Sequence, residues 1–311
     1  MKKSLIAVAA MAVVGAASAQ SSVTLYGIAD IWVGKPEGAK VQAGSGGLAR
    51  SRWGIKGSED LGGGLSANFN FESAVNLGNG ATNAAMFDRQ ANVGFSGGFG
   101  ALKIGRSWTA FDDIYGAANS GFDSALSANA VWINNYAYSN GTNTSNAQIH
   151  YTTPTMGGFS GAISTKLKGN ETAAEMRHTA VYAKYEQGPI YAGVAYEKDD
   201  GPVVLKNTLV NGSYDLGMAK VLASYYTTKT GAGIATNSYQ LGADIPMGSA
   251  LTLSVGYASS KVDVAGAKSA TGFGVAAGYS LSKRTTVYGG LRATNNIAGK
   301  DLWAVGVNHK F

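Results

Sequence analysis

The chain has 311 residues, a formal net charge of +6, 44 glycines, 16 tyrosines and no cysteine. The lack of cysteine excludes a disulfide framework, and no apolar run approaches the about 18 residues that a transmembrane helix requires. The positive charge is not gathered into a basic run with interleaved aromatic residues, so nothing indicates nucleic-acid binding. Many glycines and tyrosines with only 5 prolines instead favour short strands joined by tight turns.

The first residues have the three parts of a secretory signal peptide. Lys2 and Lys3 are followed by an apolar stretch at residues 5–15 and by the small-residue cleavage pattern ASA at residues 17–19. We therefore expect a signal peptide over residues 1–19 and a single exported domain over residues 20–311. The alternative, a buried core helix, is disfavoured by the completeness of the pattern.

Alternation of apolar with polar or small residues dominates the rest of the chain. It is clear at residues 23–33, 65–73, 251–257 and 273–279, and in the last segment Trp303, Val305, Val307 and Phe311 share one face. Seven tight turns are expected at residues 60–64, 97–100, 155–158, 188–189, 216–218, 247–249 and 281–283.

The strand pattern predicts an all-β fold, a sixteen-stranded antiparallel transmembrane β-barrel. Seven short turns and eight longer loops would join sixteen strands, with the short turns in the periplasm and the long loops outside. Apolar faces would meet lipid and polar faces a watery lumen. A soluble β-sandwich or lipocalin-like barrel shares the period of two, but it would crowd the aromatic residues into a small core.

The third long loop breaks the rhythm of hairpins. Residues 109–145 carry no strand pattern but include Phe111, Tyr115, Val131 and Trp132. A long irregular segment inside a compact protein usually has a function, and a fully solvated loop would not carry so many large apolar side chains. We expect this loop to fold against the barrel interior; a disordered surface loop is the alternative.

Several segments together resemble the general trimeric porins of Gram-negative betaproteobacteria. They are SSVTLYG at 21–27, SRWGIKGSEDLGGGL at 51–65, RQANVGF at 89–95, IGR at 104–106, YTTP at 151–154 and VGVNHKF at 305–311. The resemblance implies a sixteen-stranded barrel, a homotrimer, and a third loop folded into the lumen, where its acidic residues face basic residues of the wall. Arg52 and Arg106 match the wall arginines of that family. No arginine occurs at residues 142–145, where many relatives have one, which implies only a weak preference for anions.

The basic candidates for the pore wall are Arg50, Arg52, Lys56 and Arg106. The first three share one parity and belong on the lumen side of the second strand, since a charge facing lipid costs about 2–4 kcal/mol at the midplane. Arg106 has the parity of its apolar neighbours, as has Arg89. Either a bulge near Gly105 or a place at the rim would reconcile Arg106 with the lumen.

The acidic candidates on the third loop are Asp112, Asp113 and Asp123. A field between these carboxylates and the basic wall would select among ions. No catalytic or metal site is predicted, because His150, His178 and His309 are scattered without the spacing of metal ligands, and no cofactor is indicated.

The sequence therefore predicts a passive channel for small hydrophilic solutes and anions, held in outer-membrane lipid and weakly anion-preferring. Two alternatives remain: a substrate-specific channel on the same fold, and an outer-membrane adhesin or structural barrel with a closed lumen.

Overall fold

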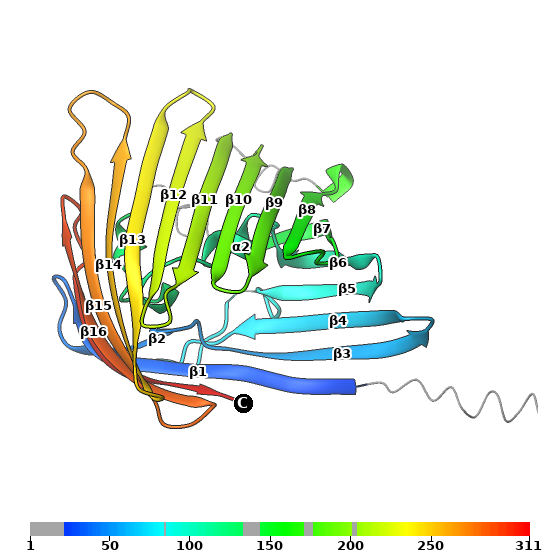
Figure 1. The fold of residues 1–311 in the computed structure, drawn as a ribbon, viewed down its shortest axis with the longest axis horizontal. Coiled ribbons are helices and arrows are strands. Elements are labelled where there is room, and N and C mark those ends of the chain that lie inside the picture. The colour runs from blue at the N-terminus through cyan, green and yellow to red at the C-terminus, as the bar shows by residue number, and fades with distance from the viewer. Residues whose placement is uncertain (1–21, 84, 133–143, 171–176, 201–203) are drawn as a thin grey trace, which may run out of the picture.

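A computed structural model describes residues 22–83, 85–132, 144–170, 177–200 and 204–311 (Figure 1). The expected signal peptide and its cleavage site lie outside these residues. The strands are β1 (Ser22–Pro36), β2 (Gln42–Ser45), β3 (Arg52–Gly62), β4 (Leu65–Ala74), β5 (Gln90–Gly97), β6 (Gly100–Trp108), β7 (Thr144–Thr152), β8 (Phe159–Lys166), β9 (His178–Gln187), β10 (Ile190–Asp199), β11 (Leu205–Asp215), β12 (Lys220–Thr230), β13 (Ala235–Met247), β14 (Leu251–Val262), β15 (Ala270–Ser280), β16 (Thr285–Asn295) and β17 (Leu302–Lys310).

The strands close into a barrel at β1. Its first half pairs with β3, from Ser22 opposite Ser58 to Ile28 opposite Arg52, and its second half pairs with β17. In Figure 1 the red end of β17 accordingly lies beside the blue β1. Every other long strand pairs antiparallel with its neighbours in the chain, so β1 and β3–β17 form a closed barrel of sixteen strands, as predicted. The short β2 is an additional strand that pairs with β1.

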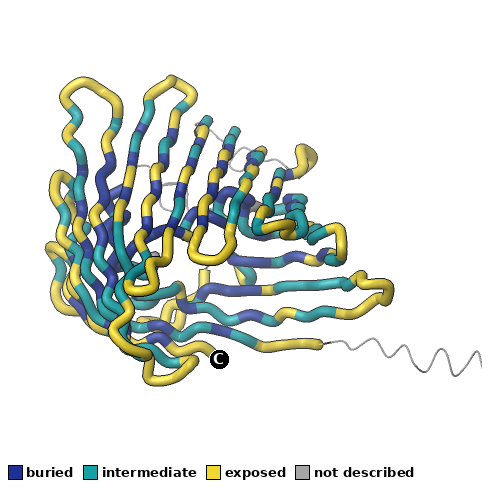
Figure 2. Tube along the Cα trace, viewed as in Figure 1, coloured by how far each residue is buried: buried dark blue, intermediate teal, exposed yellow. Residues whose placement is uncertain are grey.

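Side chains alternate between the two faces of this wall. Leu25, Val210 and Leu241 are 63%, 51% and 59% exposed on the outer face, whereas polar residues such as Asn207 and Gln240 are buried on the inner face. Figure 2 shows the same alternation as bands of exposed and buried residues along the strands. The apolar residues thus face outward and the polar residues inward, the arrangement expected of a barrel in lipid.

Connections between the strands follow the predicted pattern of short and long segments. The seven predicted tight turns join β3–β4, β5–β6, β7–β8, β9–β10, β11–β12, β13–β14 and β15–β16. The helical segments are single turns, of which α2 (Asp112–Tyr115), η1 (Gly121–Asp123) and η2 (Ala128–Val131) lie in the third loop and η3 (Lys168–Asn170) follows β8. Across the described ranges, no helix has the length and apolarity needed to cross a membrane.

Phe311 fastens the seam where the barrel closes. Its backbone N–H donates to Gly27 O at 3.1 Å, its carbonyl accepts from Gly27 N–H at 3.0 Å, and its ring lies where a side chain at residue 27 would be.

Deleting Phe311 removes both hydrogen bonds and the ring contact. We expect a lower yield of folded barrel with normal export, measured as the heat-modifiable fraction on SDS gels. The variant Phe311→Ala, which keeps the backbone bonds, should fall between the two. Equal yields for all three proteins would contradict this role.

Candidate functional site: the third loop and the basic wall

The third loop enters the barrel and follows its inner wall strand by strand. Asn211 of β11 donates to Ile114 O at 2.7 Å, Ser224 of β12 donates to Ala118 O at 3.2 Å, and Gly121 N–H donates to Ser254 Oγ of β14 at 2.7 Å. Further on, Ala125 N–H donates to Gly47 O in the first loop at 2.8 Å. The prediction that this loop folds against the interior is therefore confirmed.

Aromatic side chains from both ends of the described part of the loop, residues 109–132, pack around β12. Phe111, Tyr115 and Trp132 surround Tyr226 of β12, and the rings of Trp132 and Tyr226 stack with centroids 5.6 Å apart. Phe111 and Tyr226 are 0% and 1% exposed. These are the large apolar residues of the loop that solvent would not have accommodated, and they form a core inside the lumen.

Glycines on the wall leave the space that the loop occupies. A Cβ atom at Gly242 or Gly256 would overlap Ser120, one at Gly272 would approach Val131, and one at Gly274 would approach the backbone of Leu126. All four glycines lie on the inner face of β13, β14 or β15. Their lack of a side chain, rather than backbone freedom, is what admits the loop here, since a residue with Cβ would push it toward the pore axis.

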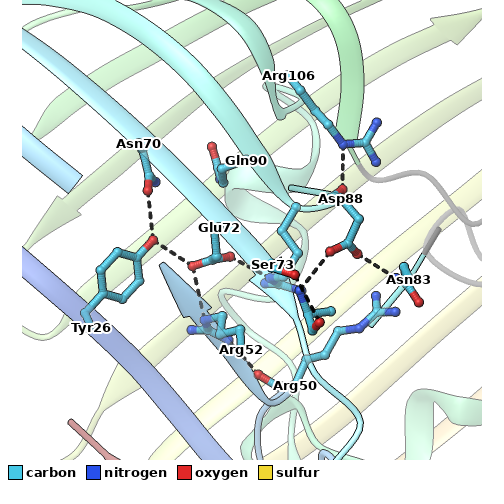
Figure 3. A network of polar contacts seen from close by, with 12 residues as sticks. Tyr26, Arg50, Arg52, Asn70, Glu72, Ser73, Asn83, Asp88, Gln90 and Arg106 are labelled. Carbon is cyan, nitrogen blue, oxygen red and sulfur yellow. Dashed lines mark hydrogen bonds and ion pairs between the residues drawn. The ribbon is translucent and has the colours of Figure 1, made fainter. Parts of the chain in front are cut away.

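On the opposite side of the barrel, Glu72 lies at the centre of a basic cluster (Figure 3). Its carboxylate contacts Arg52 Nε at 3.3 Å and Arg89 Nε at 2.5 Å, and it accepts a hydrogen bond from the Tyr26 hydroxyl at 2.9 Å. Arg89 also lies over the ring of Trp108, 4.7 Å from the centroid, at the point where the third loop begins. Two guanidinium groups against one carboxylate leave one positive charge on this part of the wall.

Arg106 lies in β6 beside a bulge whose extra residue is on β7, since Gly105 and Ser107 stand opposite Gln148 and Ser145. The register between β6 and β7 shifts between Gly105 and Ser107, and Gly105 has φ +126°, a conformation that favours glycine. Arg106 Nε donates to Asp88 O at 2.5 Å and its Nη1 donates to Asn146 Oδ1 at 2.6 Å. A bulge thus lies near Gly105, one of the two explanations offered for the parity of Arg106, while the register between β5 and β6 continues unbroken through Arg106 opposite Ala91.

Lys56 lies on the inner face, with Nζ 5.1 Å from the centroid of the Tyr26 ring. Arg50 was expected on the same strand but precedes it: β3 begins at Arg52, and Arg50 is exposed in the segment before it, so its place on the pore wall stays a prediction. The physical reason is Asp30: its buried carboxylate accepts hydrogen bonds from the N–H groups of residues 47, 48 and 49 at 2.8–2.9 Å. These contacts hold the segment before β3 out of the strand ladder.

The acidic residues of the loop lie along the other part of the wall. Asp113 Oδ2 is 3.1 Å from His150 Nε2 of β7, and the other ring nitrogen of His150 lies 3.0 Å from Trp108 O. Asp112 begins α2 beside it and is half-buried. The side chain of Asp123 lies outside the described part of the structure. In the described residues, no group of three or more metal-ligating side chains occurs.

Sequence reasoning missed Glu72 and Arg89 as members of the site. Glu72 lies on the polar face of its strand, but only the register between β3, β4 and β5 brings it between two arginines. Arg89 precedes β5 and turns inward to Glu72, so the parity of the strand does not govern it. One signal in the sequence could have indicated it: Arg89 has the parity of the lipid-facing residues of β5, and an arginine is not expected to face lipid.

A closed barrel with apolar outside, polar inside and an infolded loop is a transmembrane channel-type barrel. The chain matches the Gram-negative porin family over residues 6–299 and belongs to that family. It is 33% identical over 340 residues to outer membrane porin protein 32 of Delftia acidovorans, covering 100% of this chain and 93% of the relative. An outer membrane porin protein of Bordetella pertussis is 28% identical, with 100% of both chains covered.

Solved structures show the same fold. The anion-selective porin from Comamonas acidovorans superposes with a TM-score of 0.80 at 27% identity, covering 94% of this chain and all of the other. A trimer form of OmpT from Vibrio cholerae superposes with a TM-score of 0.73 at 17% identity, covering 94% and 99%. The protein is therefore an outer-membrane porin, a channel and not an enzyme.

Substituting one of the four inner-face glycines tests whether they determine the position of the third loop. Replacing Gly256 with Val would place methyl groups where Ser120 lies and force the loop away from the wall. We expect lower single-channel conductance and noisier open-channel current in planar bilayers. Gly212→Val is the matched control, since residue 212 points to the outer face. If both variants fold and have identical conductance, the position of the third loop does not depend on the space at Gly256.

Proposed function

We propose that this porin is a passive diffusion channel for small hydrophilic solutes and ions, with a weak preference for anions. The observation that carries the proposal is the unequal distribution of charge around the lumen. Arg52, Lys56, Arg89 and Arg106 gather on the wall from β3 to β6, and Glu72 is the side-chain carboxylate in contact with Arg52 and Arg89. The infolded loop lines the wall from β10 to β15 on the other side.

The preference is modest because carboxylates oppose the cations at close range. Glu72 offsets one of the charges of Arg52 and Arg89, and the third loop brings two further carboxylates into the lumen, Asp112 and Asp113, with Asp113 beside His150 of β7. A charged ring in a narrow pore selects ions through its local field. Salt screens that field over about 10 Å at 0.1 M, so the preference should fade as the salt concentration rises.

Reversal potentials across a salt gradient test the assignment. Neutralising Arg52 and Arg106 together, as Arg52→Gln and Arg106→Gln, should shift the reversal potential toward cations. Neutralising Asp112 and Asp113 as Asn should shift it toward anions, and Glu72→Gln should do the same from the wall. Conductance separates a channel from a closed structural barrel, and saturation of the current by one solute would reveal a substrate-specific pore. Unchanged potentials in all three variants, with normal conductance, would rule out these residues as the selectivity site.

We also propose that three copies assemble through the outer face of β16, β17, β1 and β3–β6. In the described residues, the exposed tyrosines Tyr196, Tyr214, Tyr225, Tyr239, Tyr257 and Tyr279 fall on six consecutive strands, β10–β15. Tyrosine marks the membrane–water interface of a lipid-facing surface. The arc without exposed tyrosines is thus suited to contact with protein, and a structural relative forms trimers.

Matched substitutions test this arrangement. Leu25 on β1 and Leu241 on β13 are similarly exposed, at 63% and 59%. Leu25→Trp should obstruct the interface and lower the temperature at which the unboiled oligomer dissociates on SDS gels. Leu241→Trp should leave that temperature unchanged, because a lipid-facing surface accepts tryptophan. An unmodified protein that is monomeric by native mass spectrometry in mild detergent would refute the trimer.

A further inference from the structure

A hollow of about 270 Å³ lies on the inner face of β4–β6. Four carboxamide side chains and one ammonium group border it, those of Asn68, Asn70, Gln90, Asn92 and Lys103. Across the three strands, Asn68 stands opposite Gly94, and Gly94 stands opposite Lys103. Because Gly94 has no side chain, the space between Asn68 and Lys103 stays open. The hollow extends from the level of Glu72 toward the short turns of these strands, which is the periplasmic direction.

Asn68 and Asn92 each use the amide nitrogen on the wall. Asn68 Nδ2 donates to Ser96 Oγ at 2.9 Å. Asn92 Nδ2 donates to Gln90 Oε1 at 2.8 Å and to Arg106 O at 3.0 Å. The Oδ1 atoms of Asn68 and Asn92 accept no hydrogen bond from the described residues. Two acceptors are therefore left over at the hollow.

Asn70 and Gln90 have the opposite arrangement, beside Glu72 in Figure 3. The Tyr26 hydroxyl donates to Asn70 Oδ1 at 2.9 Å, and Gln90 Oε1 accepts from Asn92, so both amide nitrogens remain as donors without a partner in the described part of the chain. Lys103 Nζ is a third donor that makes no ion pair or hydrogen bond with the described ranges. Gln90 and Asn92 are only 7% and 8% exposed. Since buried polar groups need partners, a solute in the hollow can complete hydrogen bonds that the wall leaves unmade.

We infer that the hollow binds a sugar acid, a small polyhydroxylated solute with one carboxylate. A simple anion only accepts hydrogen bonds, so it would leave the two amide oxygens without a donor. A hydroxyl group both donates and accepts, so several neighbouring hydroxyls match the mixed set of carboxamide atoms. The ammonium group of Lys103 matches the carboxylate through a charge-assisted hydrogen bond. The volume is below the about 300–1,000 Å³ of pockets that take drug-sized ligands, so one molecule of monosaccharide size is expected.

This inference rests on the proposed function, because the solute reaches the hollow through an open lumen. Saturation-transfer difference NMR on the detergent-purified porin measures the binding, with glucuronate, glucose and acetate titrated separately. The test variants are Lys103→Gln and Asn68→Leu, since leucine has nearly the shape of asparagine but no amide. The control is Lys184→Gln, which neutralises a lysine on the inner face of β9, outside the hollow. Heat modifiability on SDS gels checks that each variant folds.

We expect wild type and Lys184→Gln to bind glucuronate equally well, glucose more weakly and acetate most weakly. A hydrogen bond to a charged group contributes more than one between neutral groups. Lys103→Gln should therefore raise the dissociation constant for glucuronate about tenfold and Asn68→Leu about threefold. Lys103→Gln should also remove the advantage of glucuronate over glucose.

Three results would overturn the inference. They are acetate or glucose binding as tightly as glucuronate to the wild type, equal weakening by Lys184→Gln, and unchanged binding by both folded test variants. Conductance in potassium chloride alone, measured in parallel in planar bilayers, keeps the two proposals apart. Normal conductance without glucuronate binding would refute the sugar-acid site alone, whereas saturable binding without conductance would refute the channel alone.

Discussion

The closed ladder of backbone hydrogen bonds is the constraint on which the rest of this molecule depends. In hydrocarbon no water satisfies the peptide groups, so each strand must have a partner on both sides. β1 joins the two ends of the sheet: its first half pairs with β3, its second half pairs with β17 on one side and with β2 on the other, and Phe311 continues the pairing onto Gly27. Closure then creates an enclosed lumen, and the period of two along each strand assigns alternate side chains to lumen and lipid.

Beside this seam, Asp30 links closure to the shape of the pore. Its carboxylate is fully buried and accepts five hydrogen bonds, from the N–H groups of residues 47–49, from the Tyr288 hydroxyl and from Asn308. Donors in this number stabilise a charge that burial alone would penalise. The first loop is thereby fixed to β1, β16 and β17. The Gly47 carbonyl of this loop accepts from Ala125 N–H, so the middle of the third loop is positioned by the same residue that organises the seam.

Patterns within one strand were predictable from the sequence, and contacts between strands were not. Alternation and turn spacing predicted sixteen strands, seven tight turns and the infolded loop correctly. The pairing of Glu72 with Arg52 and Arg89 depends on register across three strands, which alternation leaves open. Arg106 lies beside a bulge on the neighbouring strand β7, and Arg50 was assigned to a strand that begins two residues after it. Both are positions that the period of two within a single strand does not describe.

The inner and outer faces of the wall can have different roles, because adjacent residues of a strand point to opposite sides of the sheet. On β11 and β12, the inner residues Asn211 and Ser224 hold the third loop, while the outer residues Lys206 and Lys229, which stand opposite each other, face away from the lumen. Sheet geometry points adjacent residues in opposite directions, so a substitution on one face leaves the other in place unless it shifts the backbone. The glycines of β13–β15 are the exception, since a side chain there would act through the loop on the pore itself. Tolerance to change in this porin should therefore follow parity and contact with the loop, rather than distance from the constriction along the chain.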